Sequence, residues 1–288
     1  MKRSHTKKRK KSTKKTIAKE GGFVRLGSAL FEPKEKRIIV FTEDMLLNQL
    51  RRDGPKIEAS FDHLCENELI QLSKNVSEIN GLIYSGLASA NREKDELRIA
   101  CAQLLMNASN SFCAAVAILR MGYVLQPGII VRSLLEAIST SLHLIQKPLD
   151  LTAYQNHKLK SPDTIAAAKK VLPPFGKMYG HFSDNFAHIG ELHKSITPIR
   201  EYNEFHEALN VNLLNLRLSA WLLYVTVELI FNELISAPRY WHSIDEGYMY
   251  NPSETEKKMD EDLFSARSIL TSELQITICT FSITGVSP

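Results

Sequence analysis

The sequence lacks the short motifs that identify the common nucleotide-binding and hydrolytic folds. Glycine is scarce, at 13 of 288 residues, which disfavours loop-rich α/β folds with phosphate-binding turns. No Gly-x4-Gly-Lys-Ser/Thr phosphate loop, Gly-x-Ser-x-Gly nucleophile turn or zinc-finger spacing occurs. These absences argue against P-loop nucleotide hydrolysis and α/β-hydrolase chemistry, and we expect no cofactor.

Paired cysteines and a long hydrophobic run are also missing. The 4 cysteines form no CxxC pair and mostly lie among apolar residues, which is typical of reduced core cysteines in a cytosolic protein. No apolar run of signal-peptide length follows the basic start. The longest uncharged stretch, Ile99–Leu119, is interrupted by Gln103, Asn107 and Asn110, which favours packing against protein over a membrane span. We therefore expect a cytoplasmic protein without a membrane partner, or a nuclear one if the host is eukaryotic.

Positive charge is concentrated at the N-terminus. Residues 1–20 contain ten Lys or Arg and one Glu, a net charge of +9. Of the 36 basic and 32 acidic residues in the chain, 26 and 31 lie beyond residue 20, a net charge of −5. Residues 1–20 cannot bury apolar surface, so a disordered basic arm is predicted.

The basic arm suits phosphate binding that does not depend on nucleotide sequence. It contains no aromatic residue, so base stacking is not provided. A nuclear localisation signal and a solubilising tail are the alternative interpretations. The candidate nucleic-acid contacts are Lys7, Lys8, Arg9, Lys10, Lys11, Lys14 and Lys15.

Apolar residues at helical spacing dominate the middle of the chain. Short links between long helices make an antiparallel four-helix-type bundle with extra short helices the natural architecture, so the expected fold class is all-α. This predicted bundle spans residues 60–235. Its helices are expected over about 60–90, 92–121, 127–146, 161–172, 175–189 and 203–235.

Two extensions flank the predicted bundle. Residues 21–59 form the N-terminal extension, with a short helix that Thr42 caps and that stops at Gly54. Residues 236–288 form the C-terminal extension, in which the capping box Ser253-x-x-Glu256 begins an amphipathic helix. The chain is thus expected to comprise an arm, two extensions and a bundle.

Each extension contains one strand candidate. Residues Arg37–Thr42 and residues 274–283 are rich in β-branched side chains. Neither segment has another obvious partner, and an isolated strand leaves its backbone groups unpaired. We therefore expect these two segments to pair, or to pack close together, as a small two-stranded sheet beside the bundle.

A polar pair lies within one of the apolar helices. Arg132 and Glu136 are four residues apart, so they share one helix face and can form an ion pair. Because buried charge requires a partner, we expect this pair to form a polar cluster with the segment 175–189. The expected contacts are Tyr179, Ser183 or His188. A purely structural ion pair is the alternative.

A second polar constellation lies between Tyr179 and His188. If this segment is helical, His181, Asp184 and His188 share one face, where Asp184 can orient either imidazole for acid–base chemistry. With Glu191 or Glu136, the same three side chains form a weak candidate for a divalent-metal site. A structural role is the third interpretation.

These motifs resemble a known family. Gly122-Tyr123-x-x-Gln126, Arg132-Ser-Leu-Leu-Glu136, Pro174-x4-Tyr179-x3-Ser183 and His188 look like the pattern of a family of uncharacterised bacterial helical-bundle proteins. That family is similar in architecture to the HEPN superfamily, whose members include ribonuclease toxins and phage-defence proteins. The resemblance covers about residues 60–235. The Ser183–His188 interval is about one residue longer than in the family pattern.

The resemblance implies a protein that binds RNA in preference to DNA and acts in stress or phage defence. Whether it also cleaves RNA is left open; if it cleaves, the resemblance implies chemistry without a metal ion. Arg132 would then stabilise the phosphorane-like transition state, and His188 would move protons. Glu136, Tyr179 and Ser183 would position these two side chains.

Another candidate pair follows from the HEPN ribonuclease signature, in which a histidine follows an arginine after four to six residues. Arg200 and His206 match this spacing, although Glu201 stands where the signature usually has Asn, Asp or His. We keep them as a reserve catalytic pair. The alternative to an enzyme is a non-enzymatic interaction module whose basic arm tethers it to nucleic acid or to a nucleoprotein partner. A homodimer is left open.

Overall fold

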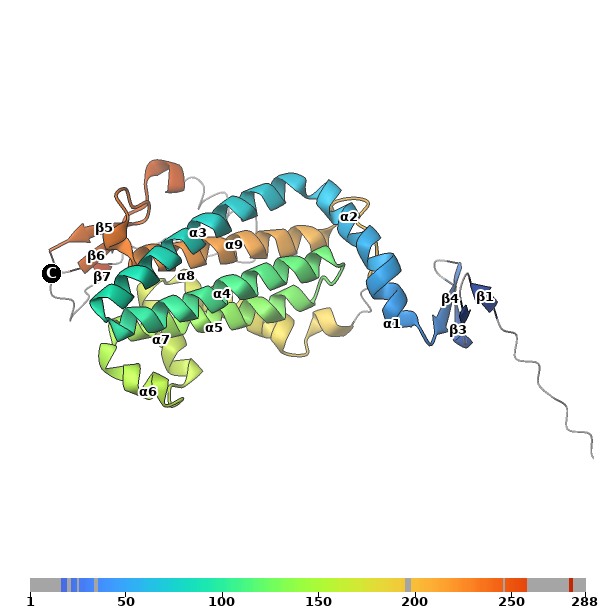
Figure 1. Cartoon of the computed structure of the whole chain (residues 1–288), viewed down its shortest axis with the longest axis horizontal. Helices are drawn as coiled ribbons and strands as arrows, with labels where there is room; N and C mark the ends of the chain where they lie inside the picture. Colours follow the sequence, from blue (N-terminus) through green and yellow to red (C-terminus); the bar gives the residue numbers. More distant parts are fainter. Residues whose placement is uncertain are drawn as a thin grey trace, which may run out of the picture. The chain divides into compact units, whose positions relative to one another are not determined.

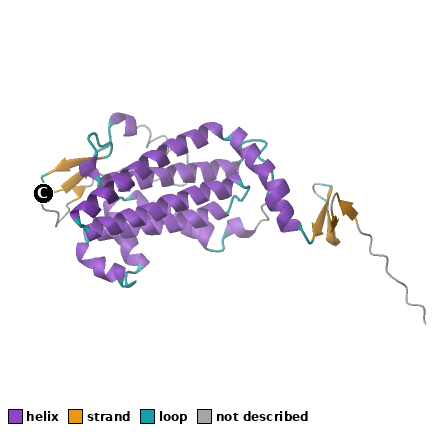
Figure 2. Ribbon diagram, in the orientation of Figure 1, coloured by secondary structure: helices purple, strands orange, loops and turns teal. Residues whose placement is uncertain are grey.

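The structure is a computed structural model of the chain, and it describes residues 17–19, 22–24, 26–33, 36–194, 198–245, 247–257 and 280–281. The chain divides into two compact units, Met1–Lys56 and Ile57–Pro288. Helices make up most of the described residues (Figure 2), so the all-α prediction is confirmed.

Four long helices form the second unit's bundle, and they lie side by side in Figure 1. They are α3 (Glu66–Glu93), α4 (Glu96–Arg120), α5 (Gln126–Gln146) and α9 (Glu207–Ile230). Short links join α3 to α4 and α4 to α5, which makes these neighbours antiparallel. The observed bounds of α5 agree with the predicted helix 127–146, where Pro127 occupies the first turn.

Shorter helices complete the helical part of the chain. They are α1 (Met45–Asn48), α2 (Gly54–Leu64), α6 (Leu151–Gln155), α7 (Ser161–Val171) and α8 (Pro174–Phe182), with single turns at Pro148–Asp150, Glu191–Lys194 and Asn232–Leu234. Two π-helical turns, η1 (Gln49–Asp53) and η3 (Ser183–Ala187), follow α1 and α8.

Several predicted helix ends are wrong by a few residues. Gly54 does not stop the first short helix, because η1 continues directly into α2. Thr42 does not cap that helix either, since its hydroxyl donates to the carboxylate of Asp44 at 2.5 Å. Asp95 caps α4 by accepting the Arg98 N–H at 3.0 Å, so this helix begins at Glu96 and not near residue 92 as predicted. Such ends depend on which polar side chain reaches a free N–H group.

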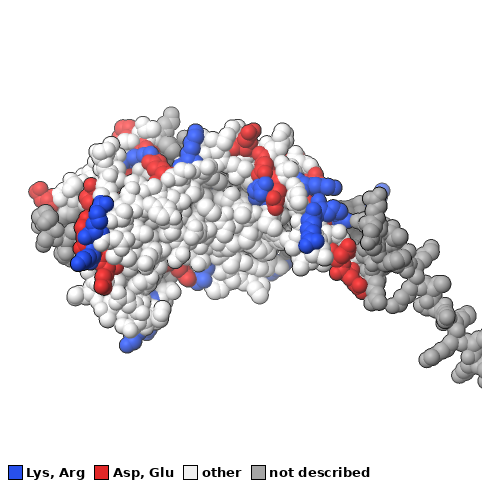
Figure 3. Space-filling view, viewed as in Figure 1, with Lys and Arg blue, Asp and Glu red and all other residues white. Residues whose placement is uncertain are grey.

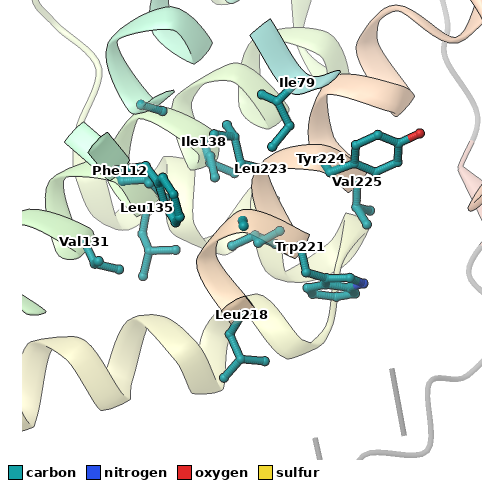
Figure 4. Packing of buried hydrophobic residues seen from close by; sticks show 14 of the residues in the cluster. Ile79, Phe112, Val131, Leu135, Ile138, Leu218, Trp221, Leu223, Tyr224 and Val225 are labelled. Atoms are coloured by element: carbon teal, nitrogen blue, oxygen red, sulfur yellow. The ribbon is translucent and has the colours of Figure 1, made fainter. Parts of the chain in front are cut away.

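The core of the second unit lies between α3, α4, α5 and α9. Figure 4 shows Phe112 of α4 close to Leu135 and Ile138 of α5, with Ile79 of α3 and Leu223 of α9 facing them. All five side chains are at most 1% exposed. Most residues of helix α9 are buried, and it contacts the other three long helices, as expected for a helix at the centre of a bundle.

A three-stranded sheet follows the bundle. It consists of β5 (Trp241–Ile244), β6 (Gly247–Tyr250) and β7 (Thr280–Phe281), in that order. The buried carboxylate of Glu228 in α9 accepts the backbone N–H groups of Arg239, Tyr240 and Trp241 at 3.1, 2.6 and 2.7 Å. This carboxylate therefore fixes the start of the sheet to the central helix.

The first unit contains two antiparallel strand pairs. Strand β1 (Ile17–Lys19) pairs with β2 (Gly22–Val24), and β3 (Leu26–Glu32) pairs with β4 (Arg37–Thr42). Strand β1 overlaps only the last residues of the predicted basic arm, 1–20. Residues 1–16 lie outside the described residues.

The predicted pairing of residues 37–42 with residues 274–283 is wrong. Both segments contain strands, but β4 pairs with β3, and β7 pairs with β6. A short link closes the β3–β4 hairpin at a much smaller entropic cost than a connection of more than 200 residues. The partner strand β3 was missed because Gly27 and Ser28 interrupt its apolar pattern. Half of the capping box is confirmed, since Ser253 Oγ accepts the Glu256 N–H at 3.3 Å, whereas the Ser253 N–H donates to the Arg239 carbonyl at 3.3 Å rather than to the Glu256 carboxylate. Most of the helix expected to follow lies outside the described residues.

Candidate functional site

A polar cluster joins α5 to α8. Arg132 Nη2 donates a hydrogen bond to the Tyr179 hydroxyl at 2.8 Å, and that hydroxyl donates to Glu136 Oε1 at 3.2 Å. Arg132 Nη2 also lies 3.2 Å from the same carboxylate oxygen. The guanidinium stacks above the Tyr179 ring, with Cζ 5.4 Å from the ring centroid. The expected contact between the Arg132–Glu136 pair and Tyr179 is therefore confirmed.

The cluster is partly open to solvent. The side chains of Arg132 and Glu136 are 32% and 36% exposed, so both charges keep part of their hydration. Arg132 Nε is buried and has no hydrogen-bond partner among the described residues. Burial raises the pKa of Tyr179, with a further contribution from Glu136 that Arg132 partly offsets, so the phenol remains protonated at neutral pH. The cluster thus offers a cation and a neutral hydroxyl to an approaching ligand.

Aromatic packing holds this cluster in place. The Tyr179 ring stacks on Phe175 of the same helix, with ring centroids 6.4 Å apart. The ring of Phe186 in η3 lies against Gly128 of α5, where an added Cβ atom would come within 2.2 Å of it. Only glycine permits this close approach between α5 and η3.

The other two predicted catalytic residues do not join the cluster. Ser183 is buried, and its carbonyl oxygen accepts the His188 N–H at 2.9 Å across five residues. This spacing is that of a π-helical turn. His188 then leaves the helix in an extended conformation with an exposed side chain. No hydrogen bond or ion pair joins the side chain of either residue to Arg132, Glu136 or Tyr179 in the described structure.

The alternative metal site receives no support from the geometry. No group of three or more His, Cys, Asp or Glu side chains within the described ranges is arranged to hold a metal ion. The His181 ring contacts Asn185 Nδ2 at 3.1 Å and packs edge-on against Phe182 and Phe186. The π-helical turn also removes the α-helical spacing that was expected to place His181, Asp184 and His188 on one face.

Arg200 and His206, the reserve catalytic pair, do not make a polar contact with each other in the described structure. His206 is the N-cap of α9, and its Nδ1 accepts the Leu209 N–H at 3.2 Å. Its ring also stacks on Tyr202, with centroids 6.1 Å apart. Arg200 is exposed, and no hydrogen bond or ion pair connects it with His206 among the described residues. His206 therefore has a structural role that the spacing of the two residues did not indicate.

The candidate arm contacts, Lys7 to Lys15, lie outside the described residues, so the structure adds nothing to their sequence-based assignment. Figure 3 shows a broad area without charged side chains in the middle of one face, with positive and negative side chains mixed around its edge. Phosphate binding by a positively charged patch is therefore not expected on this face.

Three helices are long and apolar enough to cross a membrane by length and composition alone. They are α4, α5 and α9, and 39%, 61% and 94% of their most apolar windows are buried. In α9 the apolar surface is thus almost entirely covered by the rest of the unit. In α4 the outward positions include Gln103, Asn107 and Asn110, which are exposed.

The chain matches no family model, no curated protein and no solved structure in the comparisons made with it. The resemblance to HEPN proteins therefore stays a prediction from the sequence motifs alone.

Proposed function

We propose that this protein binds single-stranded RNA, with the basic arm supplying most of the affinity. The observation that supports this proposal is the separation of charge. Ten of the first 20 residues are Lys or Arg, whereas the remainder of the chain has a net charge of −5. A polyanion is attracted to the arm and repelled by the rest of the chain, so the arm is the favoured site of first contact.

We further propose that the Arg132 cluster contacts one phosphate of the bound RNA. Arg132 is about one third exposed, and its guanidinium is oriented by the Tyr179 ring and hydroxyl. Arginine recognises phosphate oxygens through paired N–H groups. The nearby Glu136 carboxylate weakens this attraction, so the cluster acts as a secondary contact.

Binding is favoured over cleavage as the main activity. RNA cleavage without a metal needs a group that moves a proton at the attacking oxygen. Neither His188 nor His206 forms a hydrogen bond with the side chains of the Arg132 cluster in the described structure. Tyr179 keeps its proton at neutral pH, so it is not a base. We propose a cytoplasmic RNA-binding role in stress or phage defence, the setting that the HEPN resemblance implies.

The salt dependence of RNA affinity tests the role of the arm. If about six of its cations contact phosphates, the logarithm of the affinity should fall with the logarithm of salt concentration at a slope near −4. Replacing five arm cations by glutamine should reduce this slope to about −2 and weaken binding at low salt. The positions for this variant are Lys7, Lys8, Arg9, Lys10 and Lys11, all outside β1.

A matched variant controls for net charge. Five exposed lysines of the second unit replaced by glutamine should leave the slope nearly unchanged, because the overall charge changes equally but the arm is intact. Suitable positions are Lys74, Lys147, Lys158, Lys160 and Lys170. Equal slopes for the arm variant and the parent chain would rule out the arm as the RNA contact. Incubation with end-labelled RNA in the same experiments would reveal any cleavage.

A further inference from the structure

Among the described residues, the first unit has many apolar side chains, and none of them is buried. Nine large apolar side chains are between 39% and 68% exposed: Leu30, Phe31, Ile38, Val40, Phe41, Met45, Leu46, Leu47 and Leu50. Neither α1 nor η1 contains a buried residue, and the buried hydrophobic residues of the described chain begin only at Ile57. Exposed apolar surface of this extent marks an interaction site.

Both faces of the β3–β4 hairpin are apolar. The register pairs Phe31 with Ile38 and Ala29 with Val40, so these four residues share one face. Because side chains alternate along a strand, Leu30 and Phe41 lie on the opposite face. Strands with two apolar faces are typical of sheets that are covered on both sides, and a two-stranded hairpin alone is only marginally stable.

The hairpin's sequence disfavours lipid and RNA as the covering partner. The link between its strands reads Glu-Pro-Lys-Glu-Lys-Arg over residues 32–37, and such a charged tip is costly to insert into hydrocarbon. A membrane surface would cover only one face. Phe31 and Phe41, the two aromatic residues of the hairpin, lie on opposite faces, so they do not form a platform for stacking bases. Of lipid, RNA and protein, protein is therefore the partner that fits both apolar faces of the hairpin.

The charge and the area of this surface suit self-association. Residues 26–50 contain three basic and four acidic residues, so the apolar segment itself carries a net charge of only −1. Nine half-exposed side chains present about 80 Å² each, or roughly 700 Å² per copy, close to the ~800 Å² per partner of a standard interface. An apolar surface of near-zero net charge can be complementary to itself across a twofold axis.

We propose that a second copy of this chain covers these faces, and that residues 26–50 of two copies form the interface of a homodimer. Each hairpin would then have protein on both faces, supplied by the hairpin and the α1 segment of the other copy. The arm directly precedes the hairpin in sequence, so a dimer brings two arms of net charge +9 to the same interface. This last consequence rests on the proposed RNA binding, and it would raise RNA affinity through effective concentration.

Sedimentation of the full chain without RNA tests the dimer independently of RNA binding. At about 10 μM protein, within the affinity range of standard interfaces, the expected mass is twice the chain's 32.6 kDa. The double variant Phe31→Ser with Val40→Ser alters one hairpin face and should sediment as a monomer. Leu30→Ser with Phe41→Ser alters the other face and should weaken the dimer at least tenfold.

A matched variant removes equally exposed apolar side chains from the second unit. Tyr84 and Ile70 of α3 are 62% and 45% exposed, and replacing both by serine should leave the dimer intact. Circular dichroism should show unchanged helix content in every variant, because the buried core begins at Ile57.

Three results would overturn the proposal. The parent chain could sediment as a monomer, the dimer could persist in both hairpin variants, or the α3 variant could dissociate equally well. If the parent chain is a monomer that floats with phosphatidylserine vesicles, the hairpin is a lipid-binding element instead. If the hairpin variants lose RNA affinity without a change in mass, the hairpin contacts RNA instead.

Discussion

Replacing Arg132 by alanine separates a structural role of the polar cluster from a role in ligand binding. The substitution removes the hydrogen bond to Tyr179, the ion pair with Glu136 and the stacking above the Tyr179 ring. It also removes the buried Nε group, which has no hydrogen-bond partner in the described structure. The change in unfolding free energy then measures the structural role of Arg132, and the change in RNA affinity measures its role in ligand binding.

The expected loss of stability is small. A fully buried ion pair that loses one partner typically costs about 3–5 kcal/mol. Because the two charged side chains are 32% and 36% exposed, the Arg132–Glu136 pair should contribute at most about 1 kcal/mol. The stacking on Tyr179 adds about 0.5–1 kcal/mol. We therefore expect Arg132→Ala to lower the unfolding free energy by about 1–2 kcal/mol.

The expected loss of RNA affinity is about tenfold at constant salt, which corresponds to one charge-assisted hydrogen bond of ~1.5 kcal/mol. Arg120→Ala is the matched control, because Arg120 is 37% exposed and pairs with Asp62 and Glu58 outside the cluster. Glu136→Gln should act in the opposite direction and tighten RNA binding, since it removes the competing carboxylate.

Urea denaturation and fluorescence anisotropy with labelled RNA measure the two quantities. Equal affinities for the Arg132→Ala and Arg120→Ala variants would refute the phosphate contact. A stability loss above about 3 kcal/mol would show that the pair behaves as a buried structural ion pair.

Three further changes test other parts of the structure, each by urea or thermal denaturation. Glu228→Ala leaves three backbone N–H groups, two of them buried, without their acceptor and should cost about 3–5 kcal/mol. A loss under about 1 kcal/mol would show that water replaces the carboxylate. Gly128→Ala should cost about 1–3 kcal/mol because its Cβ atom would collide with the Phe186 ring, and an unchanged midpoint would contradict this tight packing. Burial raises the pKa of the Cys65 thiol to about 11 and that of the Cys101 thiol to about 12, from their ordinary value of 9.0. As the pH rises, the unfolded chain therefore loses these two protons before the folded chain does. The unfolding free energy should then fall as the pH rises above about 9. A flat stability profile between pH 8 and 10, or an unchanged one in a Cys101→Ala variant, would argue against this contribution.

The order and approximate extent of the long helices follow from the sequence by itself. Helix α5 was expected over 127–146 and spans Gln126–Gln146, because its apolar residues repeat at helical spacing and Pro127 is suited to its first turn. The contact between Arg132 and Glu136 was equally predictable, since residues four apart on a helix share one face. These features depend only on neighbours within a few residues along the chain.

The tertiary structure decided the features that join distant segments. Tyr179 meets Arg132 across 47 residues, whereas η3 ends before His188 and leaves that side chain exposed. The Glu228 carboxylate in α9 is satisfied by three N–H donors that lie 11 to 13 residues further along the chain, at the start of the sheet. Strand β4 pairs with β3 rather than with the C-terminal segment. Periodicity shows which face of an element is apolar, but the partner of each polar group depends on how the elements pack together, and this packing is set by shape and by the need to satisfy every buried hydrogen-bonding group.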